Sequence, residues 1–339
     1  MKKAFVTLVA ALLLLCTACG KSEEHSLQIF AMDTVMDFYA VGEGAQDMLN
    51  TAAQEINRLE NLLSRTRQGS EVDALNRHGS VVLSDETAAL LRQALQLSDE
   101  TGGTFDITIE PLVSAWGIHT ETPRVLTQDE IDALLPLVGS HHVQLDGNSA
   151  VLDGGCSIDL GGIAKGYASD CVAELYRQSG ITGGWASLGG NVYAHGTKED
   201  GSFWNVAIRD PQDATGAAAM VQLSNQFAVT SGGYQRYFTA EDGTVYQHII
   251  DPATGVPAQS DLLSVTVIAD NGTLADAYST ALYVMGRDGA LAFWCEHNTE
   301  FDMVLITADT VYYTAPLEGR ITTAEGGPYR VQVIAETAP

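Results

Sequence analysis

Five short segments of this 339-residue chain combine titratable side chains with the residues of tight turns. In the most informative one, His248–Pro257, a histidine leads into a turn that contains an aspartate, a glycine and two prolines. Such a turn fixes the backbone and presents one imidazole from it. The other segments are Phe105–Thr108, Asp159–Gly166, Thr230–Tyr234 and Ala275–Thr280. Together they suggest a site for a phosphorylated, aromatic ligand and a hard metal ion.

The segment Asp159–Gly166 leads into a predicted helix, Ile163–Gln178. Its paired glycines let backbone N–H groups approach an anion, and the N-terminus of a helix favours negative charge. Lys165 adds a positive charge. The pattern is neither a Walker A loop nor a dinucleotide fingerprint. A purely structural turn at the start of a helix is the alternative interpretation.

Asp276 and Thr280 are four residues apart on a predicted helix, Leu274–Met285, so that a carboxylate and a hydroxyl share one face. Mg²⁺ prefers a few hard oxygen ligands and keeps substrate phosphates as partners, and a carbonyl from another loop could complete such a set. In Phe105–Thr108, the phenyl ring could pack on a planar ligand while Asp106 accepts hydrogen bonds. A strand start with a buried phenylalanine is the alternative there.

The elements that must position these segments are read from periodicity and capping. We expect a strand over Leu27–Val41 and a helix over Gln46–Ser64. Ser84 can cap a second helix that ends at Gly102, and Thr127 with Glu130 forms a capping box for a third. A hairpin is predicted around Asp146–Asn148, and a last helix over Gly289–His297. The predicted later strands are Phe203–Ile208, Met220–Leu223, Ala228–Val229, Leu263–Ala269, Met303–Thr307 and Val311–Thr314.

This mixed order of helices, hairpins and strands predicts an α+β (mixed α/β) fold, and no sharp boundary divides residues 27–339. The net charge is −26, from 17 Lys and Arg against 43 Asp and Glu, which argues against binding of nucleic acid. An anionic cofactor would need shielding by a cation or by helix N-termini. Cys156, Cys171 and Cys295 are too few and odd in number for a disulfide framework.

Residues 1–18 are predicted to be an export signal, because two lysines precede a short apolar run, residues 4–15. The following Cys16-Thr17-Ala18-Cys19 resembles a bacterial lipobox with Cys19 as the lipidated residue, although Cys16 stands where a leucine is expected. Residues 19–26 would then be a tether. We expect a lipid-anchored protein on the extracytoplasmic face of a bacterial membrane, with simple secretion as the alternative.

In order, the segments of this chain resemble the ApbE family, the FAD:protein FMN transferases, over residues 32–286. The matching stretches are Met32–Thr34, Phe105–Thr108, Asp159–Ala168, Leu188–Asn191, Thr230–Tyr234, His248–Pro257 and Ala275–Leu282. The family usually has glycine where this chain has Asp33, and often has an aromatic residue near Thr66. Flavin affinity or ring stacking could differ because of these two departures.

The resemblance implies mixed or antiparallel sheets flanked by helices, with a ligand cleft between two packed halves. It implies that FAD is bound by Met32, Thr66, Thr104, Phe105, Asp106, Asp159, Gly161, Lys165 and Ile250. Mg²⁺ would be held by the carbonyl of Ala164 and the side chains of Asp276 and Thr280. His248, with an ordinary pKa of about 6.5, would accept a proton or steer the acceptor hydroxyl.

The implied reaction is Mg²⁺-dependent transfer of FMN from FAD to a Thr or Ser hydroxyl of an exported or membrane-bound flavoprotein, with release of AMP. Subunits of sodium-pumping or electron-transfer redox complexes are the expected acceptors. Two alternatives remain open at the level of the sequence. One is a pyrophosphatase that hydrolyses FAD to FMN and AMP, and the other is a non-enzymatic lipoprotein that stores or delivers flavin.

Overall fold

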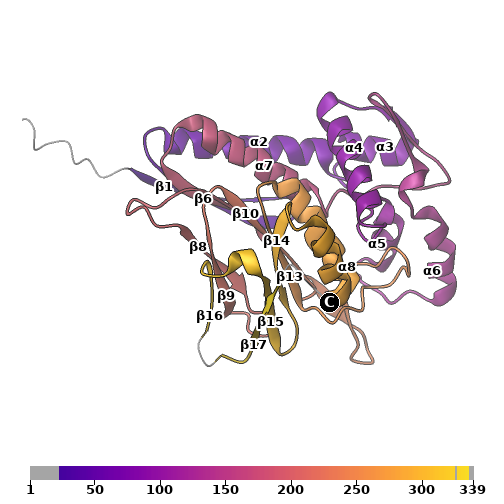
Figure 1. Ribbon diagram of the computed structural model, residues 1–339. Helices are drawn as coiled ribbons and strands as arrows, with labels where there is room; N and C mark the ends of the chain where they lie inside the picture. Colours follow the sequence, from indigo (N-terminus) through magenta and orange to yellow (C-terminus); the bar gives the residue numbers. More distant parts are fainter. Residues whose placement is uncertain (1–22, 325–326, 336–339) are drawn as a thin grey trace, which may run out of the picture.

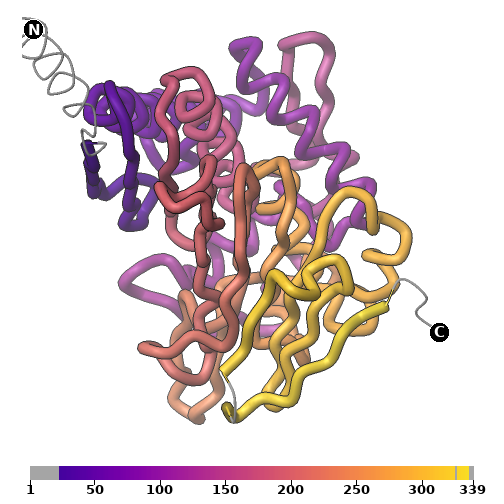
Figure 2. Tube along the Cα trace, turned by 60° about the vertical axis from the view of Figure 1, so that its left-hand side comes forward, coloured from indigo at the N-terminus to yellow at the C-terminus, as the bar shows by residue number. Residues whose placement is uncertain are grey.

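The fold is organised around a nine-stranded sheet, as seen in a computed structural model that describes residues 23–324 and 327–335. The strand order is β1-β2-β6-β7-β10-β13-β14-β15-β17, and all neighbours are antiparallel except the parallel pair β15–β17. The strands are β1 (Glu24–Ala31), β2 (Thr34–Val41), β6 (Gly183–Leu188), β7 (Asn191–Gly196), β10 (Gln226–Gly232), β13 (Ser264–Ala269), β14 (Phe301–Ile306), β15 (Thr310–Thr314) and β17 (Arg330–Ile334). The first strands and the last ones therefore lie at opposite edges, as the indigo and yellow segments of Figure 2 show.

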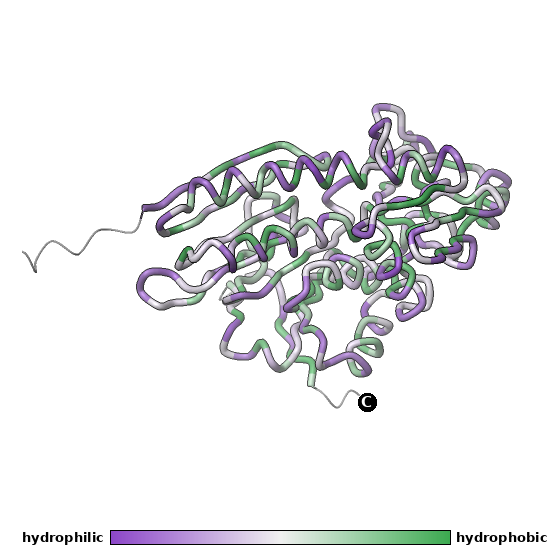
Figure 3. The backbone as a smooth tube through the Cα atoms, turned by 90° about the horizontal axis from the view of Figure 1, so that it is seen from above, coloured by the Kyte–Doolittle hydropathy of each residue, from purple (hydrophilic) through white to green (hydrophobic). Residues whose placement is uncertain are grey.

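One face of this sheet is covered by three helices, α2 (Ala45–Leu63), α7 (Ala164–Ser179) and α8 (Gly272–His297) (Figure 1). Apolar residues of all three helices enter the main core, and in α2 they recur at helical spacing, while α7 and α8 also bury polar residues such as Asp276. The alternation of green and purple along the helices in Figure 3 reflects this. α8 is interrupted at Gly286, whose φ of 71° and ψ of 178° are not helical, so the two predicted helices are confirmed.

Beside the sheet lies a helical region with its own small sheet of order β3-β5-β4 (Figure 1). Its elements are α3 (Glu71–His78), α4 (Asp85–Glu100), α5 (Glu110–Trp116), α6 (Gln128–Leu134), β3 (Ser80–Val82), β4 (Val143–Asp146) and β5 (Ser149–Leu152). The predicted caps are confirmed, because Ser84 accepts a hydrogen bond from the Thr87 N–H and Thr127 forms the full capping box with Glu130.

The opposite face of the main sheet is covered only in part, by a second small sheet of order β16-β9-β8. It consists of β8 (Trp204–Arg209), β9 (Ala217–Leu223) and β16 (Ile321–Thr323), and the hairpin of β11 (Tyr237–Thr239) and β12 (Val245–Gln247) is separate from it. A smaller apolar cluster fills the space between the two sheets. Among the described residues, no helix is long and apolar enough to cross a membrane. The predicted export signal, Cys19 and the first residues of the predicted tether lie outside the described residues.

The single strand predicted over Leu27–Val41 is wrong: the segment forms two antiparallel strands joined at Met32 and Asp33. Both turn residues have left-handed φ angles, 48° and 58°. A two-residue hairpin of this kind is usually predicted from the dipeptide Asn-Gly or Asp-Gly, and neither dipeptide occurs at this turn. The possible strand start at Phe105 is also wrong, because Asp106 caps a 3-10 turn over Ile107–Ile109.

Candidate functional site

A cleft of about 720 Å³ opens at the end of the main sheet where β1–β2 and β6–β7 turn. Segments far apart in the sequence meet there, from the end of α2 to the first turns of α8. Every residue proposed above for FAD, Mg²⁺ or proton transfer lines it: Met32, Thr66, Thr104, Phe105, Asp106, Asp159, Gly161, Ala164, Lys165, His248, Ile250, Asp276 and Thr280. The fold thus brings these side chains together, and their roles remain predictions.

Asp276 links the two helices that frame the deepest part of the cleft. α7 has no side-chain cap of its own at Ile163, and the buried Asp276 carboxylate from α8 accepts the Gly166 N–H instead, over 2.8 Å. The Lys165 Nζ lies 3.9 Å from the same carboxylate oxygen. The anion-binding potential of this helix N-terminus is therefore partly satisfied by the protein itself.

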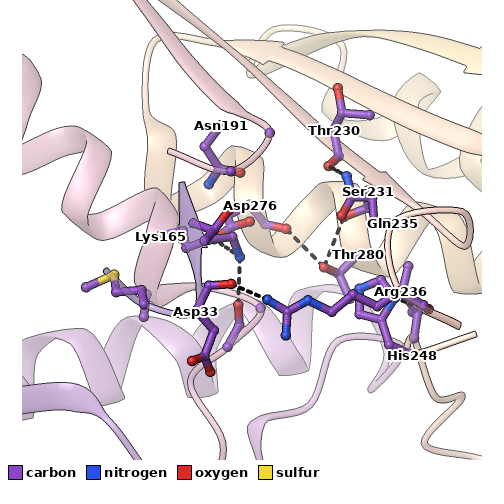
Figure 4. Close-up of a pocket in the computed structure, with 18 of the residues that line it drawn as sticks. Asp33, Lys165, Asn191, Thr230, Ser231, Gln235, Arg236, His248, Asp276 and Thr280 are labelled. Carbon is purple, nitrogen blue, oxygen red and sulfur yellow. Dashed lines mark hydrogen bonds and ion pairs between the residues drawn. The ribbon is translucent and has the colours of Figure 1, made fainter. Parts of the chain in front are cut away.

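Hydroxyl groups of α8 and β10 lie close to Asp276 (Figure 4). The Ser231 Oγ lies 2.9 Å from the Ser279 Oγ and 3.4 Å from the Thr280 Oγ1, and Thr280 donates to the Asp276 carbonyl over 3.3 Å. The possible metal ligands here are all hard oxygen donors. They are the buried Asp276 carboxylate, the Thr280 hydroxyl and the main-chain carbonyl of Ala164 at the start of α7. This donor set suits Mg²⁺ rather than a soft transition metal.

A second group of possible metal ligands, Glu55, Glu86 and Cys171, places its ligand atoms within 4.8 Å of one another. Both carboxylates already bind Arg58, at 2.6 and 2.7 Å. Tyr167 donates a further hydrogen bond to Glu86. We therefore interpret this group as an ion-pair network that joins α2, α4 and α7.

His248 lines the cleft and is held there in a defined orientation. Its Nδ1 lies 3.2 Å from the Arg236 carbonyl, which can only accept, so Nδ1 carries the proton and Nε2 is left as the acceptor. The His119 ring stands edge-on at 5.6 Å. Burial, and then the neighbouring His119, lower the pKa of His248 to about 3. The pKa therefore lies below the ordinary value of about 6.5, and the imidazole is neutral in the free protein.

The turn after His248 is as rigid as its sequence suggests. The Asp251 N–H donates to the Val256 carbonyl over 2.9 Å, and the Gly255 N–H donates to the Asp251 carbonyl over 2.8 Å. The buried Trp116 donates its indole N–H to the Gly255 carbonyl over 2.8 Å. The turn is thereby anchored to α5, and Ile250 points into a small apolar cluster that includes Trp116.

The carboxylates of the predicted FAD residues already have partners within the protein. Asp106 accepts from the N–H and the hydroxyl of Thr108, at 2.8 and 2.6 Å. Asp159 accepts from the Gly161 N–H over 2.7 Å and forms an ion pair with Arg65 at 2.9 Å. The Phe105 ring is only 4% exposed and belongs to the main core as well as to the cleft wall. These contacts hold the side chains in place before any ligand arrives.

The two departures from the family pattern have local structural explanations. Asp33 occupies a left-handed position with a φ of 58°, which glycine adopts freely and aspartate tolerates. The neighbouring Met32 N–H donates to Glu60 over 3.1 Å. Thr66 lines the cleft, where its hydroxyl lies 3.3 Å from that of Ser64. The turn therefore survives the Asp33 departure, whereas Thr66 offers no ring for stacking.

Four other side chains that line the cleft received no predicted role: Arg65, His119, Asn191 and Arg236. Arg236 reaches across it to the Asp33 carbonyl over 2.5 Å and to the His119 Nδ1 over 3.1 Å (Figure 4). Arg65 joins Asp159 to Glu110. Asn191 is 1% exposed, and its Nδ2 has no hydrogen-bond partner among the described residues. The chain has only 17 Lys and Arg. An arginine close in sequence to one of the motifs, such as Arg236, could therefore have been recognised as a candidate for binding an anionic ligand.

Comparison with known proteins agrees with this geometry. Residues 32–305 match the ApbE family. A protein of Vibrio cholerae called FAD:protein FMN transferase is 33% identical over 294 residues, which are 83% of this chain and 88% of that protein. Its namesake from Treponema pallidum is 31% identical, covering 82% of this chain and 86% of the relative.

Solved structures are similar over nearly the whole fold. The crystal structure of the ApbE protein from Thermotoga maritima has a TM-score of 0.79 and 30% identity, covering 90% of this chain and 98% of that one. The apo form of the Pseudomonas stutzeri flavinyl transferase ApbE has the same TM-score, 27% identity and the same coverage. The predicted mixed α+β fold is thereby confirmed.

Proposed function

Because the chain belongs to the ApbE family, we propose that it transfers the FMN moiety of FAD to a Thr or Ser hydroxyl of an acceptor protein and releases AMP. The observation that carries this proposal is the convergence of all the predicted site residues on one cleft. Relatives that cover most of the chain share the name FAD:protein FMN transferase.

The proposed step is a displacement at the FMN phosphorus. The acceptor hydroxyl oxygen forms a bond to this phosphorus, the bond to the AMP phosphate oxygen breaks, and AMP leaves. The hydroxyl proton passes to the Nε2 of His248, the ring nitrogen that its hydrogen bond to Arg236 leaves as an acceptor. Most of the remaining catalysis is positioning and charge stabilisation.

A neutral histidine with a pKa of about 3 is a weak base in the free protein. An anionic diphosphate beside the ring stabilises the imidazolium form and therefore raises its pKa. Substrate binding would in this way move the proton affinity of His248 toward the useful range. The low pKa of the free protein also keeps the ring unprotonated and ready at every physiological pH.

Mg²⁺ is proposed to bind the side chains of Asp276 and Thr280 and the carbonyl of Ala164, which provide a fitting set of hard oxygen donors. When bound, it would neutralise diphosphate charge and make AMP a better leaving group. Lys165 adds protein charge at the same place, because its Nζ donates to the Gly161 carbonyl over 3.1 Å and so lies over the glycine turn. These positive charges would reduce the electrostatic repulsion between the anionic substrate and a chain with a net charge of −26.

We further propose that the protein acts at the extracytoplasmic face of a bacterial membrane, anchored through lipidated Cys19. Its acceptors would be exported or membrane-bound flavoproteins, such as subunits of sodium-pumping or electron-transfer redox complexes. The sequence of residues 1–26 supports this location. Labelling cells with a radioactive fatty acid should mark the wild-type chain but leave a Cys19→Ala variant unlabelled.

The decisive experiment incubates the protein with FAD, Mg²⁺ and a soluble domain of a redox-complex subunit, followed by intact mass measurement. Transfer would add the mass of FMN to the acceptor, in equal amount to the AMP released. Omission of Mg²⁺ and omission of the acceptor are the controls. Release of FMN and AMP with no acceptor present, and no adduct in its presence, would instead identify a pyrophosphatase.

A further inference from the structure

The cleft extends beyond the residues assigned to FAD and Mg²⁺, toward the partly covered face of the main sheet. Four consecutive residues of β8, Val206–Arg209, line it. Side chains of successive strand residues point to opposite faces, so an unbroken run of lining residues means that the edge of the strand itself faces the cleft. β8 is an outer strand of its three-stranded sheet.

The hydrogen bonds of β9 show which groups of β8 are unpaired. The N–H of Gln222 donates to the Arg320 carbonyl, and its carbonyl accepts from the Arg320 side chain, so both point away from β8. Opposing residues in an antiparallel ladder alternate between hydrogen-bonded and non-hydrogen-bonded pairs. Asn205 and Gln222 therefore form a non-hydrogen-bonded pair. The same holds for Ala207 and Met220, the pair two residues further along the ladder.

It follows that the N–H and C=O groups of Ala207 point out of the sheet, at a position that lines the cleft. Neither group has a partner among the described residues outside the strand ladders. Ala207 is also exposed, so these groups are accessible. An exposed strand edge with unpaired main-chain groups is a template for another extended segment.

The β1–β2 hairpin, whose turn lines the same cleft, carries exposed apolar side chains. Phe30 and Val35 are cross-strand partners in the β1–β2 hairpin, and they are 72% and 49% exposed. Val35 alternates with the fully buried Met36, so the pair lies on the face away from the helices. The turn of the same hairpin, Met32–Thr34, lines the cleft. Tyr39, which lies on the same face of β2 as Val35, packs edge-on against Trp204 of β8, with ring centroids 5.9 Å apart. This face of the hairpin therefore lies next to β8.

We propose that the acceptor protein binds here, with an extended segment added to the free edge of β8 and its folded body against Phe30 and Val35. This inference rests on the proposed function, which requires a polypeptide hydroxyl to reach the phosphorus. Ala207 lines the same cleft as Thr230, Gln235 and His248. Main-chain pairing suits a protein substrate because it selects an extended segment while leaving one side chain to enter the site.

The test uses Ala207→Pro, because proline removes an N–H that the β8–β9 ladder does not use and blocks strand addition. The acceptor is a redox-subunit domain to which the wild-type protein attaches FMN. We expect the KM for this domain to rise about tenfold or more, the scale of losing one or two main-chain hydrogen bonds, while FAD affinity is unchanged. An unchanged KM in the folded variant would overturn the docking proposal.

A second variant tests the same proposal independently, in case Ala207→Pro does not fold. Phe30→Ser with Val35→Ser removes exposed apolar groups and should raise the same KM. The matched control is Val331→Ser with Val333→Ser on β17, at the far edge of the sheet, where the side chains are 47% and 40% exposed; it should leave the KM unchanged. Equal KM values for the two double variants would count against the proposal.

Two further outcomes separate the proposals from each other. If the wild-type protein attaches FMN to no acceptor, the proposed function fails, whatever β8 does. If transfer proceeds and the wild-type protein is a dimer that Ala207→Pro dissociates, a second copy of the chain occupies the edge, and the docking proposal is overturned.

Discussion

The two faces of the nine-stranded sheet differ in how their polar groups are satisfied. On the helix-covered face, Asp276 is 3% exposed and its carboxylate is held by the Gly166 N–H, with Lys165 nearby. On the other face, β8 ends its small sheet with main-chain groups of Ala207 that have no partner within residues 23–324 and 327–335, and Phe30 is 72% exposed. The cleft joins the two environments around the end of the sheet.

This contrast suggests a division of labour. Chemistry on a diphosphate needs charges held in fixed positions away from bulk water, which the packed helices α7 and α8 provide. Recognition of a protein segment needs accessible main-chain groups and apolar surface, which the open face provides. His248 lies between them, on a loop that Trp116 anchors, where an acceptor hydroxyl and a phosphorus would meet.

The largest expected effect concerns this meeting point. His248→Ala should lower the rate of FMN transfer by about 100-fold to 10,000-fold, the range for loss of a general base, with FAD affinity unchanged. Single-turnover transfer and FAD titration by fluorescence measure the two quantities. Wild-type transfer by this variant would refute the assigned role.

The next effect probes the closed face. Asp276→Asn keeps the size of the side chain but removes a charge, so we expect transfer to fall about 100-fold to 1,000-fold, the scale of losing one electrostatic contact. Mg²⁺ titration of the residual activity should show weakened metal dependence. If the variant keeps the wild-type Mg²⁺ response, the carboxylate is a cap of α7 and not a metal ligand.

Gly166→Ala tests whether close helix packing creates the closed face. A Cβ at this position would lie 2.3 Å from the Gly272 carbonyl oxygen and 2.6 Å from the Asp276 Cβ, so α7 and α8 must separate. We expect a loss of about 3 kcal/mol or more in the free energy of unfolding, measured in urea. Gln178→Ala, at an exposed site of the same helix, is the control and should change little.

The dependence of stability on pH tests the environment of His248. Its pKa is about 3 in the folded chain and about 6.5 when unfolded, so the unfolded state binds more protons between these values. Stability from this group is complete above pH 6.5 and is lost as the pH falls toward 3, by up to about 2 kcal/mol at pH 5. Urea unfolding at pH 7.5 and pH 5 should show a smaller loss in His248→Ala; an equal loss would contradict the burial of the ring.

The smallest effect belongs to the open face. Val35→Ser should change the free energy of unfolding by less than about 0.5 kcal/mol, because the side chain is already 49% exposed. The comparison with Gly166→Ala would then separate a surface kept for recognition from one kept for stability. A loss above 1 kcal/mol by urea unfolding would show that Val35 supports the hairpin instead.

Much of the local structure could be predicted from the sequence. The caps at Ser84 and Thr127 and the turn Asp251–Gly255 form where expected, because their hydrogen bonds close within a few residues. The β1–β2 hairpin was missed because Met32-Asp33 carries no glycine signal. The ordered series of motifs also identified the family, and with it the residues that line one cleft.

The sequence by itself determined which side chains are present and which local turns and helices carry them. Only the tertiary structure decided which of these side chains are charged and which hydrogen-bonding groups remain free. Examples are the neutral His248 beside His119, the Asp276 carboxylate that caps α7, and the main-chain groups of Ala207 that point out of the sheet. The physical reason is that ionisation and hydrogen bonding depend on neighbours in space. Those neighbours come from segments that are distant in the chain, and no local pattern encodes their approach.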